Sequence, residues 1–461
     1  MKTNRVIKIF LASSEELEAD RYRFGNLIRK LDNIYEKRGI RIELFEWEDY
    51  DAAYNGMRKQ DEYNERVRAS DMFLALFHKK AGKFTIEEFN IARKAFDEQA
   101  SPKIYTYIKD LEAGESESRE LAEFKRLMLE ELGHYWCRYS NFDTMQLHFV
   151  LQLQMVEATT PIKVEVKESQ VKIGDSTIAD LNNVPFTSEN TTHKELKSRK
   201  EQLDREIGNA ESGGRRGFFG QRSRTTDEEL ANLRAERESV TEQIERQEKA
   251  LVDTAMSIAR MQGGECSSRM RTAAELFEKG ETGKAEAVLK EDDMEADATN
   301  AKLKFDTAAQ PTAELARNIE RCAGEYMLKA RIVISGIADE SRYLKAAKLM
   351  STAIDLVSGR LPEETLAEYL FDYAVLLTDA GQQTKALETW ERLSGIYERL
   401  YRKAPQKYAY GYAGVLNNMA VLYSNKGDFD HCLSKYLKAV DIYDRLDREE
   451  PGIYDDDIAR L

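Results

Sequence analysis

The feature that most constrains the fold of this 461-residue chain is an internal repeat near its C-terminus. A shift of 46 residues superposes small, turn-forming and aromatic residues on their equivalents. The matched pairs are Ala374 and Ala420, Gly381 and Gly427, Trp390 and Tyr436, Pro405 and Pro451, and Tyr408 and Tyr454. Helical units of this length bury a continuous core only by stacking on one another. Residues 263–461 are therefore predicted to form an α-solenoid, with weaker copies of the unit at residues 273–289 and 343–353.

The charge of the chain excludes some classes of partner. Lys and Arg number 69 while Asp and Glu number 83, so the formal net charge is -14. Nucleic acids and anionic membrane surfaces attract proteins with a positive field, so we expect neither as a partner of the whole protein. No apolar run approaches the roughly 18 residues of a membrane-spanning helix, and no signal peptide is evident.

Cysteine and histidine spacing gives no sign of a metal centre. The four Cys show no CxxC spacing, and the five His show no HExxH pair. Disulfide frameworks and zinc sites depend on such spacings. We therefore expect a reduced, cytoplasmic protein that holds neither a metal nor a bound cofactor.

Residues 1–158 alternate between strand-like and helix-like segments. The predicted strands are residues 6–12, 40–45, 71–77, 103–108 and 134–139. The predicted helices are residues 14–37, 84–96, 116–132 and 142–156. This alternation is typical of a parallel sheet with helices on both faces, here predicted with a flavodoxin-like strand order. In such sheets, ligands bind beyond the carboxyl ends of the strands, where the winding reverses.

The loops after the first and third predicted strands should frame this ligand site. They contain neither GxGxxG nor GxxxxGK[ST], so a conventional dinucleotide fingerprint and a P-loop are absent. Ser13 and Ser14 follow the first strand and could offer hydroxyl and backbone N–H groups to a phosphate. The alternative is that a serine at this place only caps the next helix.

The helix after the third strand offers a candidate catalytic group. At about 100° per residue its predicted buried face consists of Ile86, Phe89, Ala92 and Phe96. Glu88 falls at the edge of that face and is expected in the first turn, whereas Glu87 is expected to point away. A carboxylate here could stabilise positive charge developing on a sugar ring. The alternative is that Glu88 merely complements the helix dipole.

Five sequence segments, taken in order and spacing, resemble a bacterial TIR-like domain over residues 5–157. They are Ile9–Ser14, Asp20–Arg21, Trp47–Asp49, Gln60–Asn64 and Phe84–Ala92. Such domains often stand at the N-terminus of defence proteins. The resemblance implies that residues 47–60 form a mobile loop over the pocket.

The same resemblance assigns roles to individual residues. The family pattern places an aromatic residue four positions before a glutamate, and Phe84 and Glu88 fit it, although the usual aromatic residue is Trp. In enzymatic members this glutamate serves cleavage of the nicotinamide–ribose bond of NAD. The resemblance thus implies Glu88 as the catalytic residue, and Ser13, Ser14, Trp47 and Phe84 as substrate-binding residues.

Residues 159–262 are predicted to connect the two ends of the chain. A short β-hairpin would pair residues 162–166 with residues 171–173, followed by an antiparallel helical hairpin with a narrow apolar seam. The tip of that hairpin, residues 212–224, is basic and holds Phe218 and Phe219 between glycines. It is expected either to dock a partner or to be a mobile, soluble loop.

The C-terminal repeats resemble a long-helix variant of the tetratricopeptide repeat, and that resemblance implies a groove for a peptide or protein. The alternative is that the aromatic residues of the array only fill the space between helices and bind no ligand. No polar capping helix is visible after the last repeat, so we expect an open apolar face at about residues 447–461. An exposed face of that kind favours homo-oligomerisation.

The expected protein is an NAD glycohydrolase or cyclase of the TIR-like type in bacterial anti-phage defence, whose repeats sense a trigger or mediate assembly. NAD would be its substrate. A non-enzymatic TIR-like signalling adaptor or scaffold is the first alternative. A nucleoside hydrolase or deoxyribosyltransferase is the second, because a glutamate beside a parallel sheet suits that chemistry too. The trigger, the product and the oligomeric state are not specified by the sequence.

Overall fold

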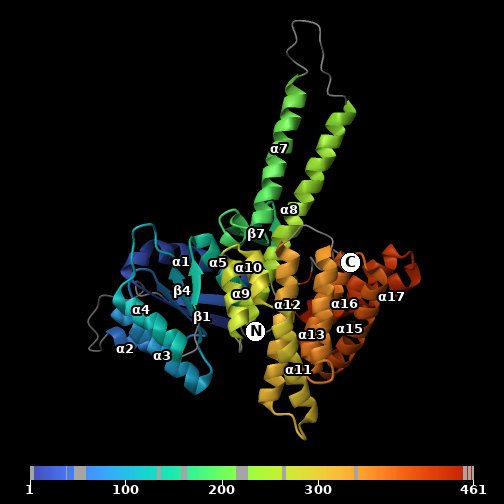
Figure 1. Ribbon diagram of the computed structural model, residues 1–461. Coiled ribbons are helices and arrows are strands. Elements are labelled where there is room, and N and C mark those ends of the chain that lie inside the picture. Colours follow the sequence, from blue (N-terminus) through green and yellow to red (C-terminus); the bar gives the residue numbers. More distant parts are fainter. Residues whose placement is uncertain are drawn as a thin grey trace. The chain divides into compact units, whose positions relative to one another are not determined.

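A computed structural model describes residues 5–37, 39–45, 59–131, 136–156, 164–213, 227–261, 266–336 and 341–449, together with Tyr454 and Ile458 (Figure 1). The chain divides into two compact units. Unit 1 comprises residues 1–153, 163–165 and 170–184, and unit 2 comprises residues 154–162, 166–169 and 185–461. By residue contacts, the helical hairpin thus belongs with the repeats, whereas the sequence predicts a separate connector over residues 159–262.

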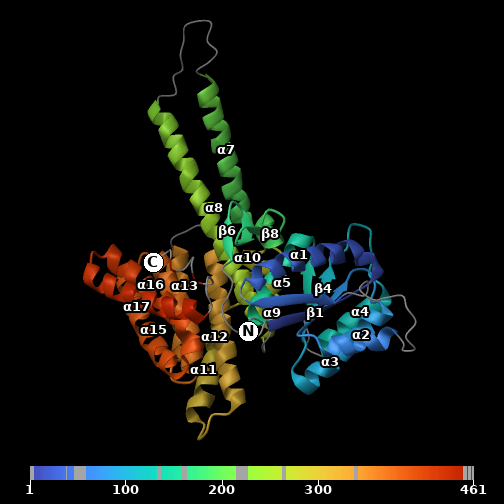
Figure 2. The ribbon, with the colours of Figure 1, turned by 180° about the vertical axis from the view of Figure 1, so that it is seen from behind.

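Unit 1 is built on a parallel five-stranded sheet of order β2-β1-β3-β4-β5 (Figures 1 and 2). Its strands are β1 (Arg5–Ser13), β2 (Ile40–Phe45), β3 (Met72–Phe77), β4 (Lys103–Lys109) and β5 (Trp136–Tyr139). The predicted flavodoxin-like strand order is confirmed. The direction of winding reverses between β1 and β3, so the carboxyl ends of these two strands form the switch point.

Helices cover both faces of this sheet. On one face, α1 (Glu18–Glu36), which follows a 3-10 turn (Glu15–Leu17), packs against α5 (Phe142–Val156) through an edge-to-face contact of Phe24 and Phe149. The other face carries α2 (Lys59–Arg68), α3 (Lys83–Gln99) and α4 (Arg119–Arg126). Helix α4 begins after Ser118, whose hydroxyl accepts a hydrogen bond from Leu121 N, and a π-helical turn (Leu127–Glu131) follows it.

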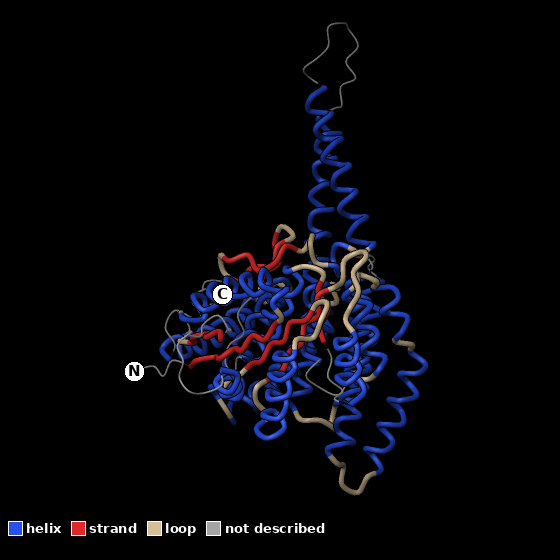
Figure 3. Tube along the Cα trace, turned by 90° about the vertical axis from the view of Figure 1, so that its left-hand side faces the viewer, coloured by secondary structure: helices blue, strands red, loops and turns tan. Residues whose placement is uncertain are grey.

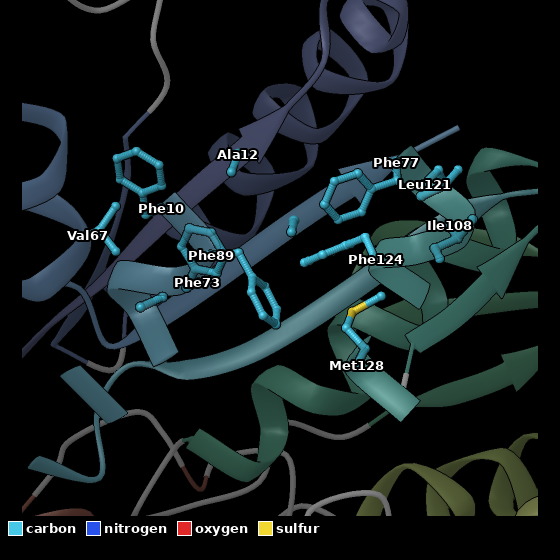
Figure 4. Close-up of a cluster of buried hydrophobic side chains, with 12 residues drawn as sticks. Phe10, Ala12, Val67, Phe73, Phe77, Phe89, Ile108, Leu121, Phe124 and Met128 are labelled. Atoms are coloured by element: carbon cyan, nitrogen blue, oxygen red, sulfur yellow. The ribbon is translucent and has the colours of Figure 1, made fainter. Parts of the chain in front are cut away.

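The core between α3, α4 and the sheet is aromatic (Figure 4). Phe73 of β3 lies between Phe10 of β1 and Phe89 of α3, with ring centroids 5.9 and 6.5 Å away. Phe89 also meets Phe124 of α4 edge to face. Every residue of β3 is buried, as expected for a central parallel strand covered on both faces.

The predicted buried face of α3 needs one correction, since Phe96 is 44% exposed. The neighbouring Ala95 is 4% exposed, so the buried face of α3 continues into its last turns through Ala95 rather than through Phe96.

Three short strands follow unit 1's last helix, in the order β6-β7-β8, where the sequence predicts two. They are β6 (Glu165–Lys167), β7 (Gln170–Ile173) and β8 (Ser176–Asp180). The turn after β8 is tied to the start of α5, because Asn183 Nδ2 donates to Asp143 Oδ2 at 2.8 Å. This contact explains why β7 and β8 belong to unit 1 although they lie beyond its predicted boundary.

Unit 2 begins with a short helix, α6 (Pro185–Ser188), and an antiparallel pair, α7 (Thr191–Gly213) and α8 (Asp227–Met261) (Figure 3). Their seam contains Leu203, Val240 and Ile244, as the heptad-like spacing predicts. Most of the predicted basic tip, including Phe218 and Phe219, lies outside the described residues.

A buried polar cluster holds the base of this helical pair. The Glu248 Oε1 atom accepts a hydrogen bond from Ser169 Oγ at 2.7 Å and lies 2.9 Å from His193 Nε2 and 3.4 Å from Lys197 Nζ. Burial raises the pKa of Glu248, but the bonds from His193 and Ser169 and the charge of Lys197 outweigh it, so the pKa is lowered. The carboxylate therefore stays ionised although it is fully buried.

The repeats of unit 2 form a row of helices in which neighbours along the chain pack side by side (Figures 1 and 2). They are α9 (Ser268–Glu278), α10 (Thr282–Val288), α11 (Glu291–Thr307), α12 (Ala313–Gly336), α13 (Ser341–Val357), α14 (Glu363–Asp379), α15 (Gln383–Lys403), α16 (Pro405–Asn425) and α17 (Phe429–Glu449). The 46-residue shift carries the bounds of α15 onto those of α17.

The turns that follow α14 and α16 also repeat after 46 residues. After α14, Gly381 has a φ of 68° and Gln382 N donates to Leu377 O at 2.9 Å. After α16, the same bond joins Asp428 N to Tyr423 O at 2.9 Å. This is the Schellman motif, in which a left-handed glycine ends a helix. A repeated sequence has thus produced a repeated backbone.

The predicted open face at residues 447–461 is covered at one point. Tyr454 is buried against Tyr410 and Tyr443, with ring centroids 6.0 and 6.3 Å away, and Ile458 joins this cluster. The other residues after Glu449 lie outside the described part of the chain. Among the helices that the structure describes, none is long and apolar enough to cross a membrane.

Replacing Glu248 with Leu should lower the stability of unit 2, because it leaves Lys197, His193 and Ser169 without their shared acceptor. The expected loss is about 3 kcal/mol, measured from urea unfolding of the full chain at neutral pH. Since the folded pKa of Glu248 is lowered, its stabilising contribution is complete above the unfolded pKa and is lost as the pH falls through the folded pKa. Glu242→Leu on the exposed side of α8 is the control, and equal effects of both substitutions would contradict the prediction.

Candidate functional site

Glu88, the predicted catalytic residue, lies on α3, the helix that follows β3 at the switch point. Its side chain is 8% exposed, so its place at the edge of the buried face is confirmed. Two details differ from expectation. Because α3 begins at Lys83, Glu88 lies in the second turn, and the first turn holds no acidic residue. Glu87 is half-buried, and its Oε1 atom accepts a hydrogen bond from Asn64 of α2 at 3.4 Å.

The structure describes only one of the two predicted aromatic contacts of the substrate. Phe84 lies in the first turn of α3 and is 56% exposed, so its ring is free to meet a ligand or another protein. Trp47 lies outside the described residues. Both assignments as substrate-binding residues stay predictions.

A buried arginine holds Ser13, the last residue of β1, and Ser14, the residue after it. Arg21 of α1 donates through one terminal nitrogen to Ser13 Oγ at 2.8 Å and to Ser14 O at 2.9 Å. Successive strand residues face opposite sides of a sheet. Ala12 belongs to the core on the α3 side, so Ser13 faces the α1 side. The structure therefore does not turn Ser13 toward α3, the helix that carries Glu88.

Ser14 belongs to a bridge across the switch point. Its hydroxyl donates to Glu16 Oε1 at 3.2 Å, and the same oxygen accepts the backbone N–H groups of Lys79 at 3.1 Å and Lys80 at 3.4 Å. The alternative role of Ser14 as a cap of the next helix is not seen, because α1 has no side-chain cap hydrogen bond. Glu16 thus joins the loop after β1 to the loop after β3, and its carboxylate occupies N–H groups that suit an anion.

A second polar cluster joins α1 to the ends of β4 and β5. Asp20 Oδ2 accepts hydrogen bonds from Lys109 Nζ at 2.9 Å and from the Tyr139 hydroxyl at 3.0 Å. Burial, and then the negative charge of Asp20, raise the pKa of Tyr139 well above its ordinary value. Tyr139 therefore stays protonated and acts as a donor to the carboxylate.

The loop after β3 carries a third set of charges. Lys79 Nζ lies 2.5 Å from Glu115 Oε1, and His78 Nε2 lies 3.3 Å from Glu115 Oε2. The hydrogen bond to Glu115 raises the pKa of Lys79 and lowers that of Glu115, so both stay charged. The cations at this edge of the sheet include Arg21, Lys79, Lys80 and Lys109, and its carboxylates include Glu16, Asp20, Asp110, Glu112 and Glu115. Lys79 and Lys109 are each paired with one of these carboxylates, and Arg21 donates to serine oxygens.

Most of the residues that build this edge were not predicted as site residues. Arg21 had a detectable signal, because it stands between Leu17 and Phe24 on the apolar stripe of its helix, where a charge needs a partner. Lys109 and Tyr139 had none, because only the order of the strands brings them to Asp20. Within the described residues, no group of His, Cys, Asp and Glu is arranged to hold a metal ion.

Comparison with known proteins does not assign a function to this site. No protein-family model matches the chain, and no curated protein is significantly similar to it.

Tyr139→Phe should destabilise unit 1, because Asp20 would lose a hydrogen bond in a buried site. A hydrogen bond to a charged group contributes about 1.5–3 kcal/mol, and a loss of that order should appear in the unfolding of the full chain. Tyr22→Phe, on the exposed side of α1, is the matched control and should have no effect. A Tyr139→Phe protein as stable as this control would show that the cluster does not hold the edge together.

Proposed function

We propose that this chain is a TIR-like effector of bacterial anti-phage defence that cleaves the nicotinamide–ribose bond of NAD. Glu88 would be the catalytic residue. The repeats would sense a trigger or mediate self-assembly. The observation that carries the proposal is a buried carboxylate on the helix that leaves the switch point of a parallel sheet.

The charges at the carboxyl edge support a substrate with a pyrophosphate. The backbone N–H groups of Lys79 and Lys80 already hold one carboxylate, that of Glu16. A phosphate oxygen is an acceptor of the same kind and would compete with Glu16 for them. Helix α3 starts after Gly82 with no side-chain cap, so the N–H groups of its first turn add positive potential.

One carboxylate is sufficient for the proposed chemistry. Nicotinamide in NAD is already cationic, so it leaves without protonation and needs no general acid. Bond cleavage passes through an oxocarbenium-like state on the ribose, and a nearby carboxylate stabilises that positive charge. Glu88 would supply this charge and orient the ribose hydroxyls or the attacking nucleophile. Burial strengthens the interaction because the local dielectric is low.

A signalling adaptor is the second candidate. The exposed Phe84 side chain favours it, because an apolar ring on the first turn of α3 could contact another TIR-like domain as readily as a substrate. A nucleoside hydrolase or deoxyribosyltransferase would use the same glutamate on a different N-glycosidic bond. An assay with NAD and with nucleosides in parallel separates these three functions.

Glu88→Gln should abolish NAD cleavage by the full-length protein. The substitution keeps the shape of the side chain and removes its charge, and the loss of one preorganised electrostatic group costs on the order of a hundredfold or more in rate. Release of nicotinamide is the measurement, both in the purified protein and in cells challenged with phage, so that an unknown trigger is present.

Glu87→Gln is the matched control on the same helix. A glutamine oxygen still accepts the hydrogen bond from Asn64, so this variant should keep most of the activity. An active Glu88→Gln protein, or equal losses in both variants, would refute the assignment and favour the adaptor.

A further inference from the structure

The turn between β6 and β7 is built from residues that disfavour its backbone conformation. Its two residues, Glu168 and Ser169, have φ values of 53° and 58° and so lie in the left-handed region. A two-residue hairpin turn with positive φ at both positions favours Asn-Gly, because most side chains are sterically strained there. In the next turn of the same sheet, between β7 and β8, Gly174 takes the left-handed position. The Glu168–Ser169 turn therefore needs support from outside the hairpin.

Helices α7 and α8 supply that support. Ser169 is 6% exposed, and its hydroxyl donates to Glu248 Oε1 of α8 at 2.7 Å and accepts a hydrogen bond from Lys197 Nζ of α7. A strained backbone conformation persists only where the surrounding structure holds it. The backbone of this turn therefore depends on the place of Glu248, which lies 79 positions further along the chain.

Helix α8 is in turn packed on the repeats. Gln247, the residue before Glu248, donates through Nε2 to Ser335 O of α12 at 3.3 Å. Two turns further along α8, Thr254 Oγ1 lies 3.3 Å from Arg331 O of the same helix. A continuous helix is a rigid element. A change in how α12 packs on α8 would therefore reach Glu248.

The other end of the turn leads into unit 1. The chain passes from unit 2 to unit 1 between Ser169 and Gln170. Strand β7 pairs with β8, and the end of β8 is tied to the first turn of α5, because Asp180 N donates to Asp143 Oδ1 at 3.3 Å. The turn thus stands between α8, which the repeats hold, and a strand pair that is attached to α5.

We propose that the Glu168–Ser169 turn is a conformational latch, which couples the packing of α8 on the repeats to β7, β8 and the start of α5. While Glu248 holds Ser169, the turn stays left-handed. Loss of this bond when α8 shifts lets the turn leave the left-handed region, and the pairing of β6 with β7 then weakens. A segment with two such arrangements is the kind of element that couples distant sites. The proposal does not rest on the proposed NAD cleavage.

Amide hydrogen exchange of the full-length protein tests whether this bond holds the turn. Ser169→Ala removes the hydroxyl and leaves a residue that disfavours the left-handed region. Exchange in residues 170–180 and 141–146 should become about tenfold faster, as expected for the loss of a hydrogen bond to a charged group. Exchange in residues 72–77 of β3 should not change. Glu242→Gln on the exposed side of α8 is the control and should behave like the wild type.

A redesigned turn separates this coupling from a simple loss of stability. The double variant Glu168→Asn/Ser169→Gly also lacks the hydroxyl, but Asn-Gly adopts the left-handed turn without outside support. Its exchange in residues 170–180 should therefore match the wild type. Glu248→Leu, which removes the acceptor, should speed exchange in these residues when the turn is Glu-Ser and should have no effect on them when it is Asn-Gly.

Three results would overturn the proposal. The first is a Ser169→Ala protein in which residues 141–146 or 170–180 exchange like the wild type. The second is an Asn-Gly protein that exchanges as fast as Ser169→Ala in residues 170–180. The third is an effect of Glu248→Leu on residues 170–180 that is equal with both turns.

Discussion

Burial of β3 on both faces is the constraint on which the arrangement of unit 1 depends. All six residues from Met72 to Phe77 are apolar and buried, so helices must cover both sides of the sheet. Right-handed crossovers then place α1 and α5 on one face and α2, α3 and α4 on the other. The winding reverses beside β3, and the loops after β1 and β3 meet at one edge. This arrangement brings the charged residues of the candidate site to one edge of the sheet.

The polar residues at that edge keep the two loops in contact. Glu16 joins them through backbone N–H groups, Arg21 holds the end of β1, and Asp20 ties α1 to β4 and β5. This edge therefore holds cations and N–H donors together with the carboxylates that pair with them. Glu88 lies in the second turn of α3, the helix that begins after this edge, and is 8% exposed. The chemistry we propose depends on an anion binding at this edge and on the buried carboxylate of Glu88.

Most elements were predictable because they depend on local apolar patterns, and the strand order was predictable because alternating strands and helices are typical of one fold type. Polar β8 was missed for the same reason, since Ser176–Asp180 shows no such pattern. Phe96 was predicted to be buried and is exposed, because the buried face of α3 continues through Ala95 instead. The Tyr139–Asp20 bond joins residues 119 positions apart, and no local pattern reveals it. The repeats were predictable because each unit contacts mainly its neighbours, so their period appears directly in the sequence.

The proposed function requires NAD to bind at the carboxyl edge of the unit 1 sheet. Amide hydrogen exchange of the Glu88→Gln protein with and without NAD tests it most directly, because this variant should bind NAD without consuming it. We expect slower exchange in residues 13–17 and 78–85 when NAD is present, and no change in residues 100–103 at the opposite edge. Protection confined to the repeats of unit 2, or exchange at both loops unchanged by NAD up to millimolar concentration, would contradict it.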